Sequence, residues 1–162
     1  MTYIEDLKPA TYGPFSLLPG TRAVGWLSKS KRHASGEIDA ECLRRVRVLY
    51  AALYNSDSFG TMSPAVTAGF HDCEFCERTG QRHGENLELY VRDPDGGGYE
   101  APAMLLHYIE EHSYSPPDAF VRAVLSADSA EALIAEQQRA SAQVIRVHQA
   151  LVAEREREHP RP

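Results

Sequence analysis

The stretch LELYVRDPDGGGYEAPAMLLHYIEEH, residues 87–112, carries the clearest information about the fold. Apolar and polar side chains alternate over residues 87–91, as they do in a strand with one buried face. Residues 93–98, Asp-Pro-Asp-Gly-Gly-Gly, form a strong turn signal, and residues 99–100 start a returning strand. The middle of the chain therefore predicts a small antiparallel sheet.

The second half of the same stretch predicts a helix that begins at Pro102. Proline is favoured at a first helical position because its missing N–H would have no partner there. Residues 115–117, Ser-Pro-Pro, end the helix. The helix therefore carries His107 and His112 near its C-terminal end, and its apolar face consists of Leu105, Leu106 and Ile109.

Working outward, the chain predicts further elements on both sides. A helix is expected over residues 39–54, with Asp39 as its N-cap. Residues 21–27 form a strand candidate that contains the only tryptophan, Trp26, which we interpret as a core residue. Residues 65–70 predict a strand that leads into a histidine and cysteine cluster. The fold class is α+β, with packed helices, a small antiparallel sheet and a ββα corner that resembles a zinc knuckle.

The C-terminal part predicts a long helix. Residues 128–131 have capping-box spacing, and the helical pattern runs to about Glu158. We divide the chain into one α+β domain, residues 1–125, and a long helix with a charged tail, residues 126–162. The helix either lies across its own domain or projects to pair with a second copy or another protein. Its heptad positions are Leu133, Gln137, Ala140, Val144, Val147 and Leu151.

Composition excludes several function classes. The chain has 162 residues and a formal net charge of -6, which disfavours nucleic-acid binding because that affinity depends on Lys and Arg neutralising phosphates. It has no apolar run near the ~20 residues that span a bilayer, and its first residues lack signal-peptide features. We therefore expect no membrane partner and a cytoplasmic location, where cysteines stay reduced.

The stretch GFHDCEFCERTG, residues 69–80, holds two of the three cysteines. Cys73 and Cys76 form a C-x2-C chelate, and His107 and His112, about thirty residues downstream, fall within the His spacing of Cys2His2 zinc sites. Thiolate and imidazole ligands together favour Zn²⁺ over Mg²⁺ or Ca²⁺. The hairpin between the two pairs can bring the helix back over the cysteines, so we predict a structural zinc site.

The fourth ligand is open at this point. Two histidines five positions apart point about 140° from each other on a regular helix, since each residue rotates by about 100°. Either the final turn at His112 is loosened, or His71 completes the site, because positions 71 and 73 of an extended segment share a face.

Two other functions use the same residues. A zinc-dependent hydrolase needs an open coordination position and a general base. A thiol redox protein would use Cys73 and Cys76 directly, but the acidic neighbours Asp72, Glu74 and Glu77 would raise the thiol pKa values. We interpret the chain as a zinc-stabilised binding or regulatory module rather than an enzyme.

Several segments also resemble an uncharacterised family of small bacterial proteins. They are Tyr3–Leu7, Ala23–Leu27, the pattern HxCxxC from His71, and HYIxxHxYxPP from His107. The resemblance spans roughly residues 3–125 and implies a bacterial source and one compact domain, with no assigned activity. The family often has glycine at the position of Ser113, so a left-handed helix cap is less expected here.

Overall fold

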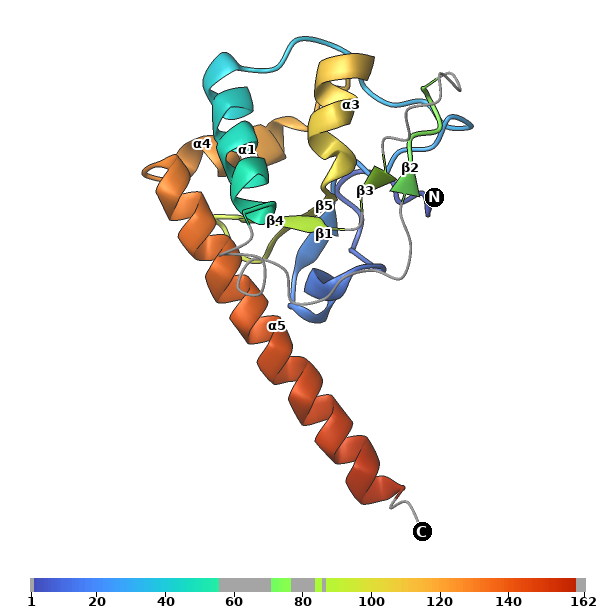
Figure 1. Cartoon of the computed structure of the whole chain (residues 1–162), viewed down its shortest axis with the longest axis vertical. Helices are drawn as coiled ribbons and strands as arrows, with labels where there is room; N and C mark the ends of the chain where they lie inside the picture. The colour runs from blue at the N-terminus through green and yellow to red at the C-terminus, as the bar shows by residue number, and fades with distance from the viewer. Residues whose placement is uncertain (1, 56–70, 77–83, 86, 160–162) are drawn as a thin grey trace.

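The computed structural model describes residues 2–55, 71–76, 84–85 and 87–159. Within these ranges it contains a small mixed sheet, packed helices and a long C-terminal helix, which confirms the α+β class (Figure 1). The strand predicted over residues 65–70 lies outside the described residues. The elements are η1 Pro14–Leu17, β1 Thr21–Ala23, α1 Ala40–Leu53, β2 His71–Asp72, β3 Gly84–Glu85, β4 Glu88–Arg92, β5 Gly98–Pro102, α3 Met104–His112, α4 Asp118–Ser126 and α5 Ala130–Glu158.

The main sheet has the order β1-β5-β4. β4 and β5 form the expected antiparallel hairpin, in which Leu89 pairs with Ala101. β1 pairs with β5 in parallel, with Thr21 opposite Gly98, so the predicted antiparallel pair is part of a mixed three-stranded sheet. The chain passes through α1 and further segments between β1 and β5, and a connection of that length allows a parallel pairing that a tight turn does not.

The start of α1 follows the predicted capping chemistry, whereas two other helix starts differ from it: α5 is capped by Ser129, one residue after the Asp128 of the predicted capping box, and α3 does not begin at Pro102. Asp39 caps α1 by accepting a hydrogen bond from the Cys42 N–H at 2.9 Å. Ser129 caps α5 by accepting from the Ala132 N–H. Pro102, however, ends β5 and does not start α3, which begins at Met104. The strand extends further because Pro102 still pairs with Glu88 across the hairpin.

The main core lies on the sheet face covered by α1, α3 and α4. Leu89, Val91 and Tyr99 of the sheet pack there with residues of these helices, including Leu49 and Phe120. Trp26 is fully buried in a smaller cluster, as predicted for a core residue. Cys42 is also fully buried, and burial raises the pKa of its thiol to about 12, so it packs as a small apolar side chain.

The opposite sheet face is also covered, although the alternating pattern predicted one exposed face. Tyr90 packs in a second cluster with Phe15 of η1 and with Ala140 and Val144 of α5. Four of the five β4 residues are consequently buried. The alternation was misleading because it cannot reveal a helix that arrives from about fifty residues downstream.

α5 both packs on the domain and extends away from it. Its buried residues end at Val144, and the part beyond leaves the body of the molecule (Figure 1). The first half of the helix therefore lies on its own domain and the second half projects from it, whereas pairing with another chain stays a prediction. Among the described residues, no helix combines the length and apolar character required to span a bilayer.

Candidate metal centre

The two cysteines lie on a short bend beside a minimal two-stranded pairing. β2 pairs antiparallel with β3, with His71 opposite Glu85 and Asp72 opposite Gly84. The chain turns directly after β2, and Cys73 and Cys76 are both partly buried. The bend therefore presents two sulfurs from one small segment, which we call the knuckle, residues 71–76.

The two histidines come from α3: His107 lies near its middle and His112 is its last residue, where the last turn is wider than an α-turn. The Ser113 N–H bonds to the Tyr108 carbonyl, five residues back, and the Tyr114 N–H bonds to the same carbonyl at 3.0 Å. Ser113 adopts a left-handed conformation with φ 52°, so the cap forms without glycine. A five-residue closure of this kind departs from the regular α-helical spacing on which the expected angular separation of His107 and His112 was based.

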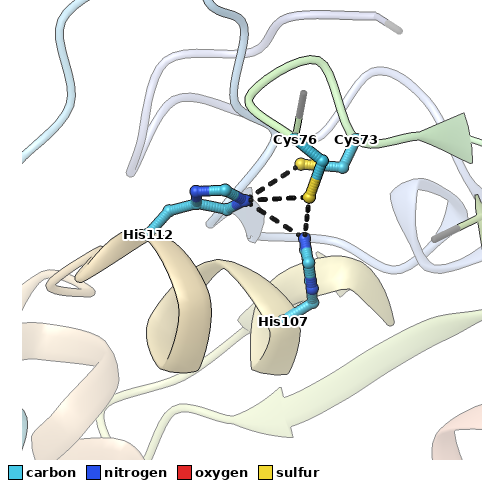
Figure 2. A group of neighbouring side chains, drawn as sticks. All are labelled: Cys73, Cys76, His107 and His112. Carbon is cyan, nitrogen blue, oxygen red and sulfur yellow. Dashed lines mark hydrogen bonds between the residues drawn. The ribbon is translucent and has the colours of Figure 1, made fainter. Parts of the chain in front are cut away.

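All four side chains converge on one point (Figure 2). The Cys73 Sγ lies 3.3 Å from the His112 Nε2, and the Cys76 Sγ lies 3.3 Å from the His107 Nε2 and 3.4 Å from the His112 Nε2. The two Nε2 atoms are 3.2 Å apart. All four donor atoms lie within 4.8 Å of one another.

These separations match the edges of a tetrahedral zinc site. With Zn–N bonds of about 2.0–2.1 Å and Zn–S bonds of about 2.3 Å, tetrahedral ligands lie about 3.3 Å apart for two nitrogens and about 3.6 Å for a nitrogen and a sulfur. The observed distances are 3.2 Å and 3.3–3.4 Å. The four atoms could therefore hold one metal ion after small adjustments.

Aromatic packing fixes the knuckle against α3. The Phe75 ring centroid lies 5.8 Å from that of Tyr108 and 5.4 Å from that of His112. It also meets the His33 ring edge-on at 5.2 Å. Tyr108 is fully buried. Phe75 thus fills the space between the bend, the helix and the segment that follows β1, and helps to orient the His112 ring.

Glu74 joins the knuckle to the loop of residues 28–33. One of its carboxylate oxygens accepts hydrogen bonds from the Ser28 hydroxyl at 3.0 Å and from the Lys29 N–H at 2.9 Å. The Lys29 hydrogen bond is the main cause that lowers the pKa of Glu74, so the group is an anion at neutral pH. Sequence reasoning missed this role, and no local signal could have paired Glu74 with a loop forty-five residues earlier.

The environment of the thiols disfavours a reactive thiolate. Burial raises the pKa of Cys76, and the neighbouring Cys73 and the Glu111 carboxylate raise it further. A protonated thiol is a poor nucleophile and a poor redox group. A positive partner such as a metal ion would favour the ionised form of the Cys76 thiol.

The structure brings together four of the five candidate ligands. Cys73, Cys76, His107 and His112 form the cluster, and His112 rather than His107 has the larger number of close contacts within it. The backbone of His71 lies in β2, but its side chain lies outside the described part of the structure. Among the described residues, this is the one group of three or more histidine, cysteine or acidic side chains with metal-site geometry.

Comparison with known proteins identifies the family. Neither the curated proteins nor the solved structures gave a match to this chain. A family model described as "Domain of unknown function (DUF7919)" matches residues 2–125, which include η1 to α4 and the whole cysteine and histidine cluster. The match covers most of the chain and agrees with the resemblance to an uncharacterised family. The chain belongs to the DUF7919 family.

Proposed function

We propose that this protein is a zinc-stabilised binding or regulatory module in which Cys73, Cys76, His107 and His112 hold one structural Zn²⁺. The observation that carries the proposal is the convergence of four donor atoms within 4.8 Å of one another. Two thiolates and two imidazoles are a donor set that suits zinc in tetrahedral geometry. The ion would tie the knuckle to α3.

A structural role is favoured over a hydrolytic one. Catalytic zinc sites have three protein ligands and keep one position for water or substrate, whereas four protein ligands fill a tetrahedron. The nearby Glu110 forms an ion pair with Arg47 at 2.6 Å, which holds this carboxylate away from the role of a general base. The raised thiol pKa likewise disfavours the redox alternative.

Elemental analysis of the purified protein tests the proposal. We expect about one zinc per chain, and a tetrahedral absorption spectrum after replacement by Co²⁺. Cys76→Ser and His107→Ala should lose most of the metal, while Cys42→Ala and His148→Ala, which alter residues outside the cluster, should keep it. A wild-type protein that takes up no metal under reducing conditions would refute the proposal, as would full metal content in the Cys76 and His107 variants.

We also propose that the projecting half of α5 binds a second copy of this chain. This half exposes Ile145, Leu151 and Val152, each 36–41% exposed, and the buried residues of the helix end at Val144. An isolated helix of this length is marginal in water, so covering these side chains would stabilise it. The alternating charges of residues 154–158 give adjacent copies little net repulsion.

Light scattering tests this pairing. A chain that ends after Val144 keeps the buried half of α5 and should be monomeric, whereas the full chain should be a dimer. The double variant Leu151→Glu, Val152→Glu should also be monomeric, with Gln149→Glu as a control on the same helix. A monomeric full chain at high concentration would contradict the pairing.

A further inference from the structure

Two carboxylic acids are buried on the sheet, and among the described residues neither has a charged partner of opposite sign. Glu88 on β4 and Glu100 on β5 have relative exposures of 1% and 0%. Glu100 pairs directly with Tyr90, and Glu88 lies two residues before Tyr90, so all three side chains share one sheet face. This is the face covered by η1 and α5. The cysteine and histidine cluster uses neither carboxyl group.

The N-terminal segment closes tightly over Glu100. The Phe15 N–H donates to one Glu100 oxygen at 2.9 Å. Gly13 has φ 87° and lies so close that an added Cβ would collide with the same oxygen. Phe15 itself is fully buried against Tyr90, with ring centroids 5.1 Å apart. The carboxyl group is therefore sealed beneath η1.

α5 forms hydrogen bonds with the backbone of β4, the strand that carries Glu88. The Gln137 side chain, fully buried, accepts from the Tyr90 N–H and donates to the Glu88 carbonyl at 3.2 Å. Gln137 thus occupies the free edge of β4 as a neighbouring strand would. Movement of β4 near Glu88 would consequently disturb the docking of α5.

Neither carboxyl group has a full set of partners. One oxygen of Glu88 and one oxygen of Glu100 are buried without a hydrogen bond, and among the described residues neither group forms an ion pair. An unpaired buried carboxylate is very unfavourable, so such groups stay protonated. Burial raises the pKa of each group to about 8, and the charge of Glu88 adds to the effect on Glu100.

Within the part of the chain that the structure describes, the surrounding elements supply no cation to the pair. α5 contributes the neutral Gln137 and Ser141, and η1 contributes backbone N–H groups and Ser16. Arg92 on β4 lies 3.7 Å from Glu136 of α5 and so forms its ion pair with that residue. The titratable and charged groups around this face are Tyr90, Arg92, Asp93 and Glu136, and the pKa of Tyr90 is itself raised by burial.

We propose that Glu88 and Glu100 act as a proton-dependent clasp that holds η1 and the first half of α5 on the sheet. With both groups protonated, the two elements close over the pair. Loss of a proton places a charge in an apolar site, and the strain is relieved when α5 and η1 separate from β4 and admit water. α3, which carries His107 and His112, packs on the opposite face of the sheet and is not part of the clasp.

The sign of the pH effect follows from linkage. The pKa of each carboxyl is raised in the closed state relative to a solvated glutamate, so the closed state binds more protons. Its stability relative to the open state is therefore greatest at acidic pH and falls as pH rises toward 8. The equilibrium constant changes by at most about tenfold per pH unit for each carboxyl.

Hydrogen exchange by mass spectrometry at pH 6 and pH 8, corrected for intrinsic rates, tests the clasp in the metal-loaded protein. Peptides from residues 130–144 should lose at least about tenfold in protection between these pH values. Peptides from α3 should keep the same protection at both pH values. In the double variant Glu88→Gln, Glu100→Gln this loss of protection should disappear, whereas Glu154→Gln, at the exposed end of α5, should behave as wild type. The same pH dependence in the double variant, or none in the wild type, would overturn the proposal.

A second measurement decides the question if the variants fold poorly. Carboxyl ¹³C resonances of the wild-type protein report each glutamate directly. We expect two of them to titrate far above the ordinary range, near pH 8. Titration of every glutamate below about pH 5.5 would mean that neither group holds a proton near neutrality, and the clasp would be excluded.

Discussion

At the level of single residues, polar side chains in buried positions specify how α5 docks. Gln137 satisfies two backbone groups at the free edge of β4, the Tyr90 N–H and the Glu88 carbonyl. Free edges of sheets are otherwise prone to pair with other chains. A long amide side chain on a helix can replace a strand because it offers one donor and one acceptor at the required spacing.

Gln137→Leu should therefore lower the stability of the fold, although it places an apolar side chain at a buried position. The change leaves a buried N–H and a buried carbonyl without hydrogen-bond partners, and each unsatisfied group costs about 1–3 kcal/mol. We therefore expect the free energy of unfolding to fall by about 2–4 kcal/mol. Urea denaturation measures it. Gln149→Leu, at an exposed position of the same helix, should change stability by less than about 0.5 kcal/mol. Equal stability of the two variants would show that the edge hydrogen bonds contribute little.

At the level of elements, the knuckle connects three parts of the chain that are distant in sequence. Cys73 and Cys76 meet the histidines of α3, and Glu74 between them holds the loop of residues 28–33 through Ser28 and Lys29. Phe75 packs against His33 and Tyr108. An ion in the cluster would therefore order the 28–33 loop as well as the knuckle.

We expect hydrogen exchange of residues 28–33 to depend on metal. Removal of zinc should increase exchange there, and Glu74→Ala should do the same with the metal still bound, because it deletes the acceptor of both hydrogen bonds. Glu110→Ala, which removes a surface ion pair with Arg47, serves as the matched control. Equal hydrogen exchange of residues 28–33 with and without zinc would show that metal binding does not order this loop through the hydrogen bonds of Glu74.

At the level of the whole molecule, the metal centre lies outside the main core. That core joins α1, α3, α4 and the sheet through large buried side chains such as Leu49, Met104 and Phe120. The clasp face with Phe15 and Tyr90 forms a separate cluster. Loss of the metal should therefore leave the main core, the clasp face and the smaller Trp26 cluster in place.

A strong chelator should accordingly lower the melting temperature without abolishing the helical circular dichroism signal. Binding of a ligand to the folded state stabilises it by about 2.7 kcal/mol when the free ligand is about 100 times its Kd. Calorimetry with and without added zinc measures the shift, and His107→Ala should abolish it. Complete loss of helical signal on chelation would mean that the core depends on the ion far more than its packing indicates.

Local patterns in the sequence predicted much of this structure. Asp39 as the cap of α1, the turn between β4 and β5, and the buried state of Trp26 were all predicted correctly, because each depends on neighbouring residues or on the chemistry of one side chain. The pairing of one C-x2-C bend with one two-histidine helix followed from ligand spacing. Pro102 was misplaced because pairing with Glu88 across the hairpin outweighed its local preference for a helix start.

By itself the sequence determined the element types, the C-x2-C bend and the helix that faces it, since these depend on spacing along the chain. Only the tertiary structure decided that β1 lies parallel to β5, that the widened last turn of α3 brings His112 beside His107, and that Glu88 and Glu100 are sealed under η1 and α5. Each of these joins segments far apart in the chain or depends on how they pack. Such contacts form because the folded molecule must cover apolar surface and satisfy backbone groups together, and no local pattern records which distant segment does so.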